Sequence, residues 1–168
     1  MPEAAHCAAV AKPVLTDAIQ DYLREIYKLG ADGGRVSVTA LAKRQGVSPA
    51  SASAMVKKLA ALDLAVHQPY RGITLTNAGE KVALEVIRHH RLLELYLAET
   101  LGVDVDEVHG EAERLEHALS EELEQRIDKA LGFPTHDPHW DPIPDANLEW
   151  PSDDQKTSAR AASATRRG

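Results

Sequence analysis

The chain has 168 residues, enough for one domain of ordinary size or two small ones. Hydrophobic residues make up 43% and aromatic residues 4%, which excludes a wholly disordered chain and predicts an aliphatic core. The single cysteine, Cys7, excludes an intrachain disulfide and is typical of a reducing compartment. Since no apolar run approaches the roughly 20 residues that span a bilayer and no secretory signal is present, we expect a cytoplasmic protein without membrane contact.

The net charge of −7 argues, taken alone, against a nucleic-acid-binding protein, but the charge is unevenly distributed. Residues 1–90 carry 11 basic and 8 acidic side chains, a balance of +3, whereas residues 91–150 carry 4 and 16, a balance of −12. Residues 151–168 carry 4 basic and 2 acidic side chains. This asymmetry indicates two regions with different tasks, of which the first can face phosphate.

The chain opens with residues 1–13, an Ala-rich stretch without periodicity that we expect to form a flexible arm. Apolar residues at helical spacing then predict a helix over 17–30, with Thr16 as its N-cap. Two shorter helices are predicted over 38–45 and 49–62.

The junction between these two shorter helices carries strong helix-end signals. Ser37 is a suitable cap for the first of them, and Gly46 is a suitable C-terminal stop. Ser48 then provides an N-cap and Pro49 occupies the favoured first helical position. Two helices joined by such a tight turn predict a helix-turn-helix.

Alternating residues over 64–68 and 73–75, separated by a Pro/Gly turn, predict a hairpin directly after the second helix of this motif. A hairpin at that place is a wing. Thr76 then caps a predicted helix over 77–102. The fold class predicted for residues 14–76 is therefore an N-terminal winged helix-turn-helix domain.

A mainly α fold continues over residues 77–146, which we predict to be a second, helical domain. A helix is expected from Asp104 to Leu131, opened by a capping-box-like pair of Asp104 and Glu107 and interrupted, if at all, near Gly110. The following Pro-rich stretch is expected to be extended, and its His136 and His139 are assigned to a surface loop. Residues 147–168 are expected to form a disordered tail.

The helix-turn-helix and wing predict contact with double-stranded DNA. Small side chains let the recognition helix approach a groove closely, and its N-terminal amide groups favour phosphate. The candidate DNA-contacting residues are Ser37, Thr39, Ser48, Pro49, Ala50, Ser51, Ser53, Lys57 and Arg71. The alternative is that these serines and alanines only favour a helix, and that the lysines form a solvated face.

Carboxylate and imidazole side chains recur at helical spacing in the acidic half. Glu113, Glu116 and His117 share one helix face, His109 lies four residues earlier, and His90 and Glu94 form another i, i+4 pair. With Asp21 of the first helix, these residues form a ligand set suited to Mn, Fe, Co, Ni or Zn. The alternative is an acidic, solvated helix face.

The sequence carries no zinc-protease pattern, phosphate loop, dinucleotide fingerprint or nucleophile elbow. We therefore expect that the protein is not an enzyme and has no small-molecule substrate. A helical metalloenzyme that uses the same ligands is the least favoured interpretation.

Five ordered segments together resemble the diphtheria toxin repressor family of metalloregulators. They are Asp21–Tyr27, Tyr70–Thr76, His90–Glu94, Glu107–His117 and Asp141–Pro144. The resemblance covers about residues 14–146. It implies a homodimeric repressor, with dimerisation and metal ligands in the second domain, that binds palindromic operator DNA when loaded with a divalent metal.

By motif position, the resemblance places Asp21, Glu113, Glu116 and His117 in one ligand cluster. It places His90, Glu94 and His109 in the other site of the family. The iron-responsive branch has methionine and cysteine at the positions of Asp21 and Glu113, whereas this chain has carboxylates, as the manganese-responsive branch does. The implied cofactor is Mn²⁺, with Fe²⁺, Co²⁺ and Zn²⁺ as alternatives.

The chain also departs from the family pattern. Arg24 stands where the manganese prototype has a further glutamate ligand, and Ala54 replaces a longer polar residue of the recognition helix. We also expect no third, SH3-like domain. The sequence thus predicts a metal-dependent repressor of metal-homeostasis genes such as those for uptake transporters. The alternative is a winged-helix regulator that senses an organic ligand or redox state.

The mechanism expected from this reading is a metal-controlled hinge. Without metal, the clustered polar groups repel and the DNA-binding unit moves freely. With metal, the two recognition helices of a dimer are held about 34 Å apart, as a palindrome requires.

Overall fold

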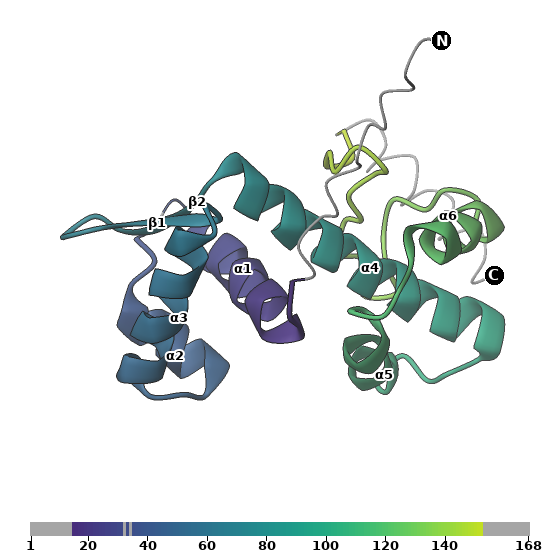
Figure 1. Ribbon diagram of the computed structural model, residues 1–168. Helices are drawn as coiled ribbons and strands as arrows, with labels where there is room; N and C mark the ends of the chain where they lie inside the picture. Colours follow the sequence, from purple (N-terminus) through teal and green to yellow (C-terminus); the bar gives the residue numbers. More distant parts are fainter. Residues whose placement is uncertain (1–14, 32, 34, 153–168) are drawn as a thin grey trace, which may run out of the picture.

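The computed structural model describes residues 15–31, 33 and 35–152, and this part of the chain is mostly helical, with six helices and one two-stranded sheet (Figure 1). The predicted fold class is confirmed. The predicted arm over 1–13 and all residues after 152 lie outside the described part. Among the described residues, no helix is both long and apolar enough to cross a membrane.

The first domain consists of three helices followed by a hairpin, in the predicted order. Its elements are α1 (Asp17–Gly30), α2 (Val38–Gln45), α3 (Pro49–Ala61), β1 (Ala65–Gln68) and β2 (Gly72–Leu75). The side-chain oxygens of Thr16, Ser37 and Ser48 each accept the backbone N–H three residues ahead, so all three predicted caps are confirmed. Gly46 has a φ of 65°, the left-handed conformation that ends α2.

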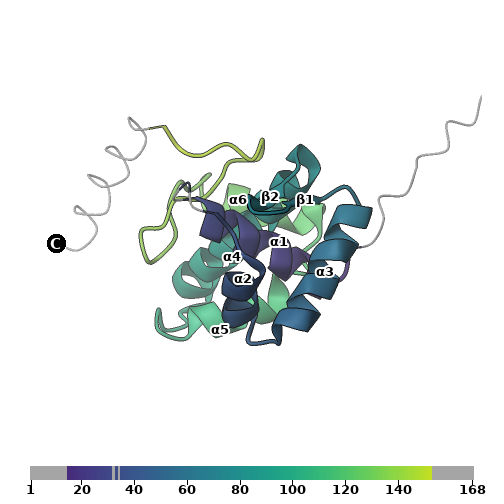
Figure 2. The same cartoon turned by 90° about the vertical axis from the view of Figure 1, so that its left-hand side faces the viewer.

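The apolar faces of these elements meet in one core. Leu23 of α1, Leu41 of α2 and Leu59 of α3 are fully buried, and Ile73 of β2 joins them. Figure 2 looks onto this domain, where α3 lies along its outer side. Helix α3, the predicted recognition helix, therefore packs against the domain through one face only.

The hairpin is anchored by a contact that the sequence did not predict. The N–H of Ile73 donates to the carbonyl of Val36 at 2.8 Å, so the chain before α2 adds a short third edge. Gly72 is required at this point, because its φ is 88° and a Cβ would lie 2.8 Å from the Val36 carbonyl oxygen. The base of the wing is therefore fixed to the body of the domain.

The longest helix, α4 (Asn77–Leu101), has 25 residues and runs through both domains (Figure 1). Thr76 caps it as predicted, with its Oγ1 accepting the N–H of Gly79 at 3.1 Å. Ala83, near its start, belongs to the first core, whereas Leu92 and Leu93 belong to a second one. Because α1 also packs alongside α4, the two domains share a common support.

The second domain is completed by α5 (Val108–Leu115) and α6 (Glu121–Ala130), which both pack against α4. The prediction of one helix from 104 to 131 is wrong, because the chain breaks over 116–120 while Gly110 lies inside α5. Ser120 restarts the helix, with its Oγ accepting the N–H of Leu123 at 3.2 Å.

The predicted capping box at the start of α5 does not form. The Asp104 carboxylate accepts the N–H of Asp106 at 2.9 Å, inside a turn that precedes the helix. Glu107 makes no side-chain capping bond. The helix starts later than predicted because Asp104 satisfies a turn rather than a helix end.

A buried arginine joins α4 to α6. Arg88 is 2% exposed and donates to Glu124 at 2.5 Å, to Asp128 at 2.7 Å and to the carbonyl of Pro144 at 2.7 Å. His89 adds a contact to the second oxygen of Glu124 at 3.0 Å. Removing one partner of such a buried network leaves charge unpaired, which is strongly destabilising.

The segment after α6 packs against the body instead of extending away from it. Ile143 and Pro144 are buried. The prediction of a disordered tail from residue 147 is wrong for residues 147–152, since Pro151 is also buried there.

Trp150 connects this segment to both domains. Its Nε1–H donates to the Tyr27 hydroxyl of α1 at 2.9 Å, and the two rings stack with centroids 6.3 Å apart. The guanidinium of Arg91 on α4 lies 5.5 Å from the Trp150 ring centroid. We call this three-residue contact the Trp150 clasp.

Candidate functional site

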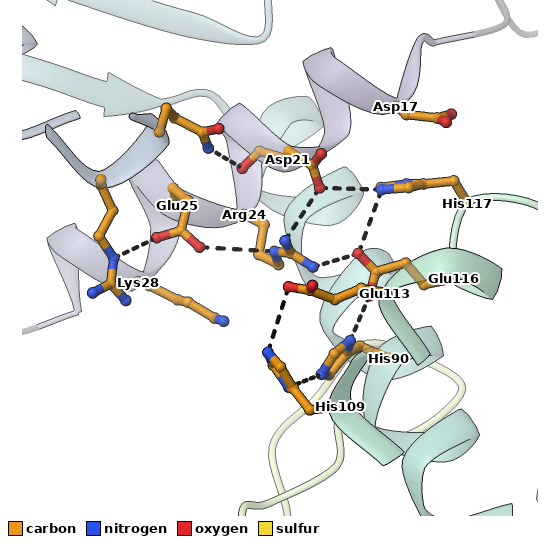
Figure 3. A pocket seen from close by; sticks show the side chains of 12 residues that line it. Asp17, Asp21, Arg24, Glu25, Lys28, His90, His109, Glu113, Glu116 and His117 are labelled. Carbon is orange, nitrogen blue, oxygen red and sulfur yellow. Dashed lines mark hydrogen bonds and ion pairs between the residues drawn. The ribbon is translucent and has the colours of Figure 1, made fainter. Parts of the chain in front are cut away.

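A polar cavity of ≈ 660 Å³ lies between α1 of the first domain and α4 and α5 of the second, with residues of α2 on its wall (Figure 3). Six of the seven predicted metal ligands line it: Asp21, His90, His109, Glu113, Glu116 and His117. The seventh, Glu94, contacts two of these histidines. The predicted ligands therefore gather at the junction between the domains.

His90 and Glu94 lie one turn apart on α4, and His109 reaches them from α5. The Nε2 of His90, the Oε1 of Glu94 and the Nδ1 of His109 are each 3.0 Å from the other two. Glu94 is 2% and His90 8% exposed, whereas the His109 side chain is 60% exposed. This α4–α5 triad is thus buried on one side and open on the other.

The outer nitrogens of both imidazoles face carboxylates. The Nδ1–H of His90 donates to Glu116 at 2.5 Å, and the Nε2 of His109 lies 3.4 Å from Glu113. A carboxylate at the outer nitrogen orients each ring, as in metal-bound histidines, so the inner nitrogen faces the triad. The three inner atoms need a shared cation, which is either a proton or a metal ion that replaces it.

The spacing of the triad suits a metal ion. Adjacent corners of an octahedron lie 3.0 Å apart, as these donors do, when its centre is about 2.1 Å from each, a normal metal–ligand distance. Two imidazoles and one carboxylate on one octahedral face form a known divalent-metal ligand set. The residues present therefore fit a divalent cation with nitrogen and oxygen ligands.

The electrostatics of the triad favour opposite charges on its members. Burial lowers the pKa of His90, but hydrogen bonds to Glu116 and Glu94 outweigh it and raise the pKa to about 9. Burial raises the pKa of Glu94, but the hydrogen bond and charge of His90 outweigh it and lower the pKa to about 2. Glu94 is thus held as a carboxylate, the form that ligates metal.

A second group joins α1 to the end of α5. The Nε2 of His117 lies 3.1 Å from the Oδ1 of Asp21 and 3.4 Å from the Oε1 of Glu116, while its Nδ1–H donates to the Gln20 side chain at 2.8 Å. We call Asp21, Glu116 and His117 the α1–α5 cluster. Its contacts with α1 and α4 explain the break after α5, since Glu116 and His117 turn toward those helices.

Arg24 of α1 enters this cluster (Figure 3). Its guanidinium donates to Glu116 and lies 3.2 Å from Asp21. Burial raises the pKa of Asp21, and Arg24 and His117 act against it. The expectation that the clustered groups simply repel is therefore incomplete, because Arg24 supplies positive charge among them.

Glu113 lies apart from the cluster to which the resemblance assigns it. Its carboxylate faces the Nε2 of His109, and its side chain is 49% exposed. The structure thus brings Asp21, Glu116 and His117 together but places Glu113 beside the triad.

A third group contains two residues outside the predicted ligand set. The Oε2 of Glu94 lies 3.6 Å from the Nδ1 of His139, and Asp137 completes a set of donors within 4.8 Å of one another. Burial raises the pKa of Asp137 to about 6, and the charge of Glu94 acts in the same direction. In the sequence both residues belong to an Asp-Pro-His segment, which by itself predicts only a surface loop.

The predicted DNA-contacting residues lie on the outside of the first domain. Those with exposed side chains are Ser37, Thr39, Ser48, Pro49, Ala50, Ser51, Lys57 and Arg71, whereas Ser53 is half-buried. Along α3, Ala50, Ala54 and Lys57 follow one exposed helix face opposite the buried Val56. This face has short side chains and a basic end, as a groove-binding helix requires.

The wing adds a second basic point. Arg71 lies in the hairpin turn, and the guanidinium of Arg35 donates to the carbonyl of Tyr70 at 2.6 Å. Tyr70 is 96% exposed, so its side chain projects into solvent while Arg35 holds its backbone. Arg35 was not predicted, because its place beside the wing depends on the fold.

The fold is that of a winged-helix DNA-binding protein, and carboxylate and imidazole groups suited to a metal ion gather at its domain junction. Residues 14–73 match the N-terminal DNA-binding domain of the iron dependent repressor family, and residues 76–145 match its metal binding and dimerisation domain. The chain belongs to this family of metal-dependent transcriptional repressors. The family resemblance seen in the sequence is confirmed.

Relatives from bacteria and archaea support this assignment. An uncharacterised HTH-type transcriptional regulator of Methanocaldococcus jannaschii is 37% identical over 114 residues, 67% of this chain and 91% of that protein. The diphtheria toxin repressor of Corynebacterium diphtheriae is 35% identical over 130 residues, 77% of this chain and 58% of that protein. The chain thus spans little more than half of that repressor.

Among solved structures, a manganese-dependent transcriptional repressor in complex with manganese is 47% identical and superposes with a TM-score of 0.72. The match covers 80% of this chain and 62% of that one.

Proposed function

We propose that this chain represses transcription as a homodimer that binds a palindromic operator when a divalent cation, Mn²⁺ first among them, is held at the domain junction. The observation that carries the proposal is the α4–α5 triad, whose three inward-facing nitrogen and oxygen atoms lie 3.0 Å apart. The manganese complex of a 47% identical repressor supports the choice of metal. Acting on DNA, the protein works in the cytoplasm, on genes for metal-ion homeostasis such as uptake transporters.

The donor chemistry also supports manganese or iron. The three donor groups offer only carboxylate oxygen and imidazole nitrogen, the ligands preferred by hard and borderline divalent ions. Fe²⁺, Co²⁺ and Zn²⁺ remain alternatives with the same ligand types. Glu94 belongs both to the triad and to the group with Asp137 and His139, so its two oxygens can serve two neighbouring cations.

A bound cation supplies positive charge that offsets the acidic second domain. Ligands from both domains would let that charge fix the orientation of one domain against the other, because Asp21 lies on α1 whereas Glu116 and His117 follow α5. Since α1 packs against α2 and β2, drawing Asp21 toward α5 also positions the recognition helix. The expected effect is a population shift of a few kcal/mol at most.

The second domain carries apolar side chains suited to a second copy of the chain. Leu101 at the end of α4, Val105 in the following turn and Leu115 at the end of α5 are 62%, 42% and 44% exposed. Dimerisation through such side chains removes apolar surface from water. A two-fold dimer presents two α3 helices to half-sites about 34 Å apart, which is one turn of DNA.

The test is metal-dependent DNA binding by the full chain. Operator DNA is selected from a random pool in Mn²⁺, and its affinity is then measured by fluorescence anisotropy in Mn²⁺ and in chelator. We expect tight binding only with Mn²⁺, and a large loss of the metal response in Glu94→Gln. Glu99→Gln, on the exposed side of the same helix, is the matched control and should respond normally. Equal DNA binding in chelator and Mn²⁺ would contradict the proposal.

A further inference from the structure

Arg24 makes the closest contacts in the α1–α5 cluster. One of its terminal nitrogens donates to the Oε1 of Glu116, and the other lies 3.2 Å from the Oδ1 of Asp21. Its side chain is 11% exposed. The guanidinium is therefore a largely buried partner of two carboxylates that belong to different domains.

The two oxygens that Arg24 holds are also the two that a cation would need. In the α1–α5 cluster, the Nε2 of His117 lies 3.1 Å from the Oδ1 of Asp21 and 3.4 Å from the Oε1 of Glu116. The other oxygen of Glu116 is already bonded to His90. A metal ion and the guanidinium therefore compete for the same atoms, and both are positively charged.

A further carboxylate, that of Glu25, lies near the Arg24 guanidinium. Its Nε is buried and has no hydrogen-bond partner, although the Oε1 of Glu25 lies 3.9 Å away. Both residues line the cavity, and the other oxygen of Glu25 is bonded to Arg44. A guanidinium that leaves Asp21 and Glu116 thus finds a carboxylate beside it, and the unpaired Nε gains an acceptor.

We propose that Arg24 is a built-in competing cation that sets the metal affinity of the α1–α5 cluster, so that a metal binds there in exchange for the guanidinium. The exchange replaces the single charge of the guanidinium with the double charge of the metal ion, so a cation lies between Asp21 and Glu116 throughout. It also keeps α1 joined to α5, first by arginine hydrogen bonds and then by shared ligands. The inference rests on the proposed metal-dependent function and adds a residue that determines the metal threshold of one site.

The experiment isolates the α1–α5 cluster by a single background substitution. Because Glu94 belongs to both other donor groups, Glu94→Gln weakens them together. Mn²⁺ binding to the full chain is then measured by electron paramagnetic resonance of the free ion, with and without Arg24→Gln. Glutamine has a similar reach but carries no charge.

We expect the Arg24→Gln variant to bind Mn²⁺ about tenfold or more tightly than its background, since charge-assisted hydrogen bonds no longer compete. Arg44→Gln is the matched control, because Arg44 lines the same cavity but bonds only to Glu25 among the described side chains. It should leave the affinity unchanged. Equal or weaker Mn²⁺ binding in Arg24→Gln, or none at all, would overturn the inference.

Thermal unfolding in chelator shows whether each variant folds. If Arg24→Gln does not fold, Arg24→Lys keeps the charge but loses the planar two-donor geometry, and it should bind Mn²⁺ with an affinity above the background. An affinity no higher than the background would again overturn the inference. Failure of the proposed function is a separate result, seen as metal-independent DNA binding by the unmodified chain.

Discussion

Replacing Gly79 by alanine should destabilise the protein more than any other exchange of a helical glycine that the structure describes. Gly79 lies in the first turn of α4, where an added Cβ would lie 1.9 Å from the carbonyl oxygen of Leu64 and 2.9 Å from its carbon. That oxygen already accepts the N–H of Thr76 at 3.1 Å, and the Thr76 hydroxyl donates to the carbonyl of Asp63 at 2.6 Å. The Leu64 backbone is held by these hydrogen bonds, so it cannot shift without weakening them.

The cost follows from the displacement required. Reaching van der Waals contact needs a shift of more than 1 Å, which is overpacking worth about 1–3 kcal/mol. Loss of the Thr76 cap adds about 1 kcal/mol. For a chain of this size, a total near 3 kcal/mol lowers Tm by about 6–12 °C.

Gly110→Ala is the matched control, because Gly110 is also helical and its added Cβ would meet only the end of the Arg114 side chain, at 3.8 Å. Alanine there should stabilise by about 0.5–1 kcal/mol. Both variants are compared by thermal unfolding followed by circular dichroism. The reasoning is refuted if Gly79→Ala is as stable as the unmodified chain, or if both variants shift in the same direction.

Three further outcomes are expected. Lys57→Ala should weaken DNA binding and lower the slope of log affinity against log salt concentration by about one, while Mn²⁺ binding stays unchanged. An unaltered slope in anisotropy titrations would show that Lys57 does not contact DNA phosphate. Burial raises the pKa of Glu124, but hydrogen bonds from His89 and Arg88 outweigh burial and hold the pKa below the ordinary 4.5. The ionised Glu124 therefore stabilises the fold above pH 4.5, and this stabilisation is lost as the pH falls through the lowered pKa. Glu124→Gln should therefore lower Tm at pH 7 by an amount that narrows below pH 4.5, and a constant difference across that range would contradict this reading. Trp150→Phe keeps an aromatic ring but removes the N–H that Tyr27 accepts, so it should cost about 1 kcal/mol in urea unfolding. No change would show that this hydrogen bond contributes nothing to stability.

Local signals in the sequence were sufficient to predict the helix ends and the order of elements in the first domain. Thr16, Ser37, Ser48 and Thr76 each lie three residues before the N–H that they accept, so a short window of sequence contains the whole interaction. Gly46 similarly marks a helix end by its own conformational freedom. Interactions of this range can be predicted from one sequence.

The donor groups were predicted only in part, because they depend on contacts between distant residues. His90 and Glu94 are one turn apart and were paired correctly by helical spacing. Asp137 and His139 reach Glu94 across more than forty residues of chain, and no periodicity links them. Glu116 ends its helix for a similar reason, since its partners Arg24 and His90 belong to other elements.

The length of α4 has a consequence for reading DNA. A helix of 25 residues is about 37 Å long, and its first turn is fitted against Leu64 so closely that only glycine is accommodated at position 79. The helix is therefore a stiff lever with the dimerising domain at one end and the winged helix at the other. A tilt of about 5° at one end moves the other by about 3 Å, close to the rise of one base pair. In the dimer proposed above, a recognition helix carried on this lever would move by one base step with a very small rotation. Small changes at the junction would then suffice to bring two half-sites into or out of register.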